Sequence, residues 1–142
     1  MVYRTQLKRA GAALAILFLC SAWMFPAEQK PDCDIHAGPC TKTAGNSAVT
    51  LEISPRPVKH MEELLFSVTI KPCQSLPENL MLDLSMPGME MGKNQVKLVK
   101  KSNCLYQGKG LIVKCMSGRK LWKATVLSEK LNNPAFSFDV RD

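Results

Sequence analysis

The sequence predicts an all-β fold, a seven-stranded antiparallel immunoglobulin-like β-sandwich over residues 48–142. Three observations predict it: short apolar segments with period-two alternation, turn residues between these segments, and seven such segments within about 95 residues. Alternation of this kind is typical of strands that bury one face. Seven short, closely spaced strands favour a sandwich of two antiparallel sheets, although the Cys–Trp–Cys pattern of antibody domains is absent.

The expected strands cover, in chain order, residues 49–53, 64–70, 80–86, 96–98, 105–113, 122–126 and 136–140. Proline, glycine and asparagine mark the turns between them, at 54–57, 71–73, 87–88, 117–118 and 132–134. The inward positions of this pattern predict a core of ten residues: Leu51, Phe66, Val68, Leu82, Leu84, Leu98, Trp122, Val126, Phe136 and Phe138.

Residues 1–27 are predicted to be a signal peptide or an uncleaved membrane-anchor helix. Arg4, Lys8 and Arg9 precede an apolar run over 10–25, as in a secretory signal. No good cleavage site follows, which favours the anchor, with the N-terminus in the cytoplasm. Either form exports the rest of the chain to the periplasmic side of the cell envelope. Residues 28–47, rich in turn-forming residues, are expected to be a tether.

Five cysteines lie beyond the signal, and an oxidising compartment favours their pairing. Successive antiparallel strands run in opposite directions, so alternate loops share one end of the sandwich. This predicts that Cys73 and Cys104 meet at one end and form a disulfide. A second disulfide between Cys40 and Cys115 is within reach of the extended tether, with Cys33–Cys40 as the alternative.

Residues 86–92 read MPGMEMG, which places Met86, Met89 and Met91 around a Pro-Gly turn. Thioether sulfur is a soft ligand that suits Cu(I). The same topological argument places Met116 and His60 at this end of the sandwich, so these five residues are the predicted metal ligands. The alternative is that the methionines pack beneath the end of the sandwich as core residues.

Three segments carry a family resemblance: MPGMEMGKNQVKL, the segment at 106–110, and the segment at 115–118 that leads to Trp122 and Ala124. Through them the chain resembles the YtkA-like domain family over about 49–140. The resemblance implies an exported immunoglobulin-like sandwich associated with copper or heavy-metal handling. By position, Met86, Met89, Met91 and Met116 match the family's methionines. The segment 33–40 lies outside the resemblance.

The charge distribution is uneven: the formal net charge is +7, and residues 93–123 hold nine cations and no acid. This stretch lacks the aromatic residues and recognition helix of a nucleic-acid module, so no nucleic-acid partner is expected. No catalytic motif is present, and no enzyme is expected. Two hypotheses remain: a domain that binds or delivers copper, or a non-catalytic protein-interaction domain of an envelope assembly. An envelope or metal-efflux protein is the expected partner of either.

Overall fold

The protein is described by a computed structural model, which covers residues 29–142. These residues form eight β-strands and one short 3-10 helix. The strands are β1 (Cys40–Ala44), β2 (Ser47–Ser54), β3 (Leu64–Lys71), β4 (Asn79–Ser85), β5 (Gln95–Lys100), β6 (Leu105–Gly110), β7 (Leu121–Leu127) and β8 (Ala135–Asp139), and the helix is η1 (Glu129–Leu131). The all-β prediction is therefore confirmed, and each of the seven expected segments contains a strand.

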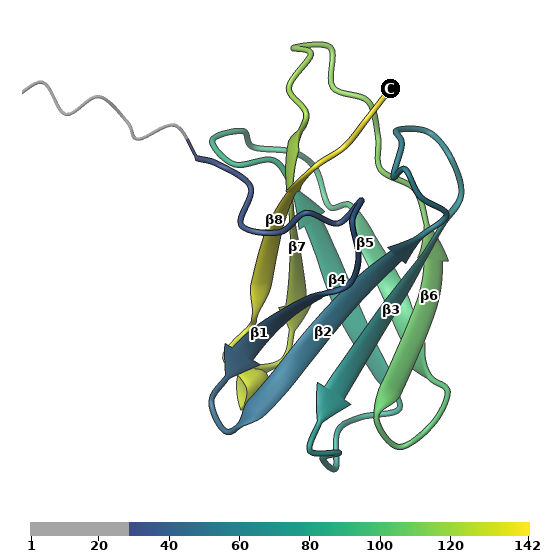
Figure 1. Cartoon of the computed structure of the whole chain (residues 1–142), viewed down its shortest axis with the longest axis vertical. Helices are drawn as coiled ribbons and strands as arrows, with labels where there is room; N and C mark the ends of the chain where they lie inside the picture. The colour runs from purple at the N-terminus through teal and green to yellow at the C-terminus, as the bar shows by residue number, and fades with distance from the viewer. Residues whose placement is uncertain (1–28) are drawn as a thin grey trace, which may run out of the picture.

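All eight strands belong to one antiparallel sheet, in the order β1-β2-β3-β6-β5-β4-β7-β8. The sheet curls until its two edge strands lie on the same side, so that it nearly closes into a barrel (Figure 1). Inward side chains fill the interior, and all ten predicted core residues are buried. The predicted N-terminal helix lies outside the described residues.

The segment 28–47, expected as a tether, contributes the extra strand β1 instead. Its residues pair with β2 through a two-residue turn at Gly45–Asn46, in which Gly45 has a φ of +61°. Two-residue hairpin turns require such positive φ angles, which glycine adopts at little cost. The sequence pattern did not predict this five-residue strand, because Pro, Gly and Asn residues surround it and its outer positions are both threonine.

Residues 32–42 also close the seam between the two edge strands. The N–H groups of Asp32 and Cys33 donate to the carbonyl oxygen of Ser137 in β8, over 2.9 and 3.1 Å. The Ser137 N–H donates back to the Asp32 carboxylate. Lys42 of β1 pairs with Asp32 and donates to the carbonyl oxygen of Ala135. These contacts satisfy backbone groups that an open sheet edge would expose.

Two disulfides are present. Cys73 and Cys104, with Cα atoms 4.8 Å apart, join the β3–β4 and β5–β6 loops as predicted. Cys33 pairs with Cys40, with Cα atoms 5.8 Å apart, so the preferred Cys40–Cys115 pairing is wrong and its alternative is correct. The Cys33–Cys40 disulfide joins two cysteines of the same segment and so holds residues 33–40 against the seam. A Cys40–Cys115 disulfide would have tied this segment to the upper end instead.

The alternation of strand direction gathers three loops at one end, which we call the upper end: residues 55–63, 86–94 and 111–120. These loops lie at the top of Figure 1, opposite the Cys73–Cys104 disulfide. The segments predicted to carry the metal ligands therefore do share one end of the molecule.

Only two residue pairs are in register between β5 and β6. A Cβ atom on Gly108 would overlap the carbonyl oxygen of Lys97 in β5. We therefore expect Gly108→Ala to lower the free energy of unfolding by about 1–3 kcal/mol through overpacking. Urea titration measures this change. Gly38→Ala is the control, because no atom lies within 4 Å of its Cβ position; an equal effect of both substitutions would contradict the explanation.

Candidate sulfur site

The Met-Pro-Gly-Met sequence forms a tight turn at the upper end. The N–H of Met89 donates to the carbonyl oxygen of Met86 over 3.2 Å, and Gly88 has a φ of +74°. Met86 extends the inward row of β4 and is only 2% exposed. Met86 therefore lies where the packing alternative expected it, because the period-two pattern of β4 continues one residue past the strand and directs this side chain into the core.

Met89 and Met91 are half-buried and pack against the edge of the core. Met116, in contrast, is fully exposed, with a relative accessibility of 105%. The structure thus separates the four predicted methionine ligands into one core residue, two at the core edge and one on the surface. The sulfur of Met89 lies beside another sulfur.

That second sulfur belongs to Cys115, whose Sγ atom lies 3.9 Å from the Sδ atom of Met89. Ser117 Oγ lies 3.0 Å from Cys115 Sγ and 3.8 Å from Met89 Sδ. Two sulfurs bound to one tetrahedral ion at about 2.3 Å each would lie about 3.8 Å apart. The observed separation of Met89 and Cys115 is close to that value.

A turn positions Cys115 for this contact. The Gly118 N–H donates to the carbonyl oxygen of Cys115 over 3.1 Å, and Gly118 has a φ of +70°. Arg119 then donates to the carbonyl oxygen of Pro87 over 3.4 Å, which links this turn to the methionine turn. Cys115 is the free cysteine of the described chain and is half-buried.

The thiol of Cys115 lies in an environment that favours its ionised form. The Ser117 hydroxyl contributes most, followed by the Ser117 backbone N–H and the positive charge of Arg119, and together they lower the pKa of Cys115 below its ordinary value. A thiolate is the form of cysteine that binds metals and reacts with electrophiles. Cys115 was not among the predicted ligands, because it was expected to form a disulfide with Cys40, although the five cysteines beyond residue 27 leave one thiol unpaired.

His60 does not join the sulfurs as a ligand. Its side chain is buried, and its Nε2 atom accepts the indole N–H of Trp122 over 3.3 Å. An indole N–H only donates, so Nε2 carries no proton and its lone pair is occupied. The other ring nitrogen, Nδ1, lies 3.4 Å from the Asp142 carboxylate. His60 thus links the β2–β3 loop to the core beneath the upper end.

Asp142 is held in turn by two cations of the β6–β7 loop. Lys114 and Lys120 lie 3.0 and 3.2 Å from its carboxylate oxygens. Hydrogen bonds from these two lysines lower the pKa of Asp142 to about 2. The last described residues therefore carry a negative charge that fastens the base of the loop holding Cys115.

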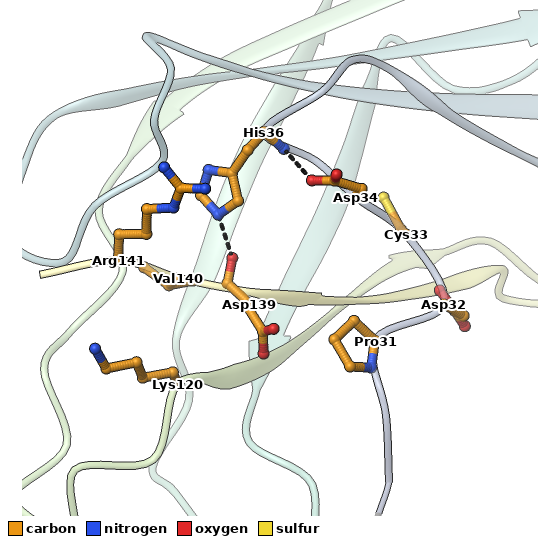
Figure 2. A pocket seen from close by; sticks show the side chains of 9 residues that line it. All are labelled: Pro31, Asp32, Cys33, Asp34, His36, Lys120, Asp139, Val140 and Arg141. Carbon is orange, nitrogen blue, oxygen red and sulfur yellow. Dashed lines mark hydrogen bonds between the residues drawn. The ribbon is translucent and has the colours of Figure 1, made fainter.

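A cavity of about 750 Å³ lies beside the seam, between residues 31–36 and the end of β8 (Figure 2). His36 forms part of its wall. The ring Nδ1 accepts the Val58 N–H over 3.1 Å, so Nε2 carries the proton and donates to the carbonyl oxygen of Asp139 over 2.9 Å. Both nitrogens are used, which makes His36 a structural link between the seam segment and the sheet.

Within residues 29–142, no group of three or more His, Cys, Asp or Glu side chains is arranged to hold a metal ion. A thioether-containing site is of a different kind. No helix in the same part of the chain is long and apolar enough to cross a membrane. Comparisons with protein-family models, curated proteins and solved structures found no match to the chain.

The environment of Cys115 makes a testable prediction about its reactivity with pH. Because a lowered pKa means that the thiolate forms at lower pH, the alkylation rate of native Cys115 should reach half its plateau below the pH of an ordinary thiol. Ser117→Ala removes the hydroxyl group that lowers the pKa of Cys115 most, so the variant should reach half its maximal alkylation rate at a higher pH. Alkylation followed by mass spectrometry of the Cys115 peptide measures both midpoints; identical midpoints would contradict the assigned cause.

Proposed function

We propose that this protein is an exported, membrane-anchored domain that binds or delivers Cu(I), or another soft metal ion, through sulfur ligands at its upper end. The observation that carries the proposal is the separation of 3.9 Å between Met89 Sδ and Cys115 Sγ. Thiolate and thioether ligands select Cu(I) over hard cations. The function is binding and transfer, with no catalysis.

The surroundings of the pair support exchange of an ion with a partner. Cys115 is half-buried, so one side of the pair stays open to an incoming ligand. Met116 is fully exposed, and its side chain loses no packing when it turns toward an ion beside Cys115. An envelope or metal-efflux protein that supplies or accepts the ion is the proposed partner. Binding would release the thiol proton, and the lowering of the Cys115 pKa by its surroundings favours that release.

Export is supported by the cysteine chemistry. Two disulfides fit an oxidising compartment, as the extracellular space or periplasm provides. Anchoring rests on the apolar run over 10–25 and the three cations before it. The proposed assignment to an immunoglobulin-like class is supported by the orders β2-β3-β6-β5 and β4-β7-β8, which match the A-B-E-D and C-F-G sheets of that class, although here β4 also pairs with β5. Membership of the YtkA-like family remains a proposal based on the methionine turn.

A specific observation favours the second candidate function, a non-catalytic interaction domain of an envelope assembly. Met86 lies in the core, and Met89 and Met91 pack against it, as methionines that only fill space would do. In that case the contact between Met89 and Cys115 is ordinary packing, and the full chain should bind no Cu(I) tightly.

Competition with a coloured Cu(I) chelator under reducing, anaerobic conditions separates the two functions. The full chain would carry Cys20→Ser, so that this cysteine, which lies outside the described residues, cannot bind the ion. We expect it to bind one Cu(I), and Met89→Leu or Cys115→Ser to weaken affinity at least about ten-fold through loss of a ligand.

Met81→Leu is the matched control, because Met81 lies on the outer face of β4, away from the upper end. Its affinity should stay within about two-fold of the parent. Equal affinities of all four proteins would show that no ion binds at the sulfur pair. Absence of tight binding in the parent would leave the interaction domain as the function.

A further inference from the structure

We propose that the upper end docks on an anionic lipid bilayer, so that the loops with the sulfur pair face the membrane surface. The inference rests on the anchoring proposed above but not on metal binding. It concerns the outward side chains of the three upper loops, and it is carried by their apolar residues, their charge and the short connection to residues 10–25.

The first observation is the placement of exposed apolar side chains. Five large apolar residues of the described chain are well exposed, and three of them lie in the upper loops: Met61 at 63%, Leu111 at 42% and Met116 at 105%. The N–H of Met61 donates to the carbonyl oxygen of Ile112 over 2.9 Å, so the loops that carry Met61 and Leu111 adjoin. Exposed apolar residues at adjoining loop tips are unfavourable in water and suit insertion at a lipid interface.

The second observation is charge. The three upper loops contain six cations and three acids, a net charge of +3, and residues 111–120 contain Lys114, Arg119 and Lys120 with no acid. Glu62 and Glu63 are engaged in ion pairs with Lys59 and Lys109. Lys114 and Lys120 pair with Asp142, so Lys93 and Arg119 are the loop cations with no ion pair among the described residues. Apolar tips surrounded by lysine and arginine fit a surface of anionic headgroups, to which each nearby cation is attracted.

The third observation is the length of the connection between the folded domain and the apolar run over 10–25. Asp32 is fixed to Ser137 of β8 by backbone hydrogen bonds. It lies seven positions after Phe25, the last residue of the apolar run, and a fully extended connection of that length spans at most about 25 Å. An anchored chain therefore holds the domain within reach of the bilayer, and the apolar and basic loops decide which end faces it.

The alternative orientation would use the outer face of the sheet. Val99 and Leu127 are the other two exposed apolar residues, at 41% and 40%. They are strand residues in β5 and β7, and they do not project from a loop tip. This pair provides a control of matched chemistry at a different place on the molecule.

The test uses the full chain, metal-free, reconstituted into nanodiscs of phosphatidylcholine alone or with about one third phosphatidylglycerol. We would measure the rate of amide hydrogen exchange of residues 112–118 and the rate of alkylation of Cys115. Both rates fall when the bilayer covers the upper loops. We expect both to slow about five-fold or more in the anionic discs, and to recover at about 1 M salt, where charges are screened.

The triple variant Met61→Ser, Leu111→Ser and Met116→Ser should abolish this protection, whereas Val99→Ser with Leu127→Ser should leave it unchanged. Equal rates in the two kinds of disc, protection that survives the triple variant, or protection lost in the control variant would each overturn the proposal. Protection in both discs alike would indicate a protein contact, such as a second copy. Because copper affinity is measured separately in detergent, failure of docking and failure of metal binding are distinguishable.

Discussion

The structure depends on closure of one curled sheet along the seam between β1 and β8. The Asp32–Ser137 hydrogen bonds, Lys42 and the Cys33–Cys40 disulfide fasten this seam from the N-terminal side. Closure lets eight strands share a single core. The pairing of β4 with β7, which places Ser85 opposite Lys123, brings the methionine turn and the Cys115 turn together at the upper end.

Much of the fold could be predicted from sequence because alternation records which face of a strand is buried. The ten core residues and the Cys73–Cys104 disulfide follow from alternation and strand direction alone. Strand β1 could not be predicted in the same way. It is an edge strand of five residues with mostly polar outward side chains, and its place depends on pairing with β2 and on the seam contacts.

The sequence predicted which loops meet at the upper end, but not which of their side chains lie together. Sequence spacing places Met86 and Met89 on one turn, but the inward register of β4 buries Met86 while Met89 reaches Cys115. Cys115 was obscured because pairing of Cys40 with the nearer Cys33 depends on how residues 33–40 fold. His60 is hidden by a contact with Trp122, 62 positions away, that no local pattern records.

The central functional claim is that Met89 and Cys115 share one soft metal ion. X-ray absorption at the copper edge of the Cu(I)-loaded full chain tests it most directly, because it counts the sulfur atoms bound to the ion. We expect two or more sulfur atoms at about 2.3 Å from the copper ion in the native chain, and one fewer in Met89→Leu. Coordination by nitrogen or oxygen alone, or a spectrum unchanged by Met89→Leu, would contradict it.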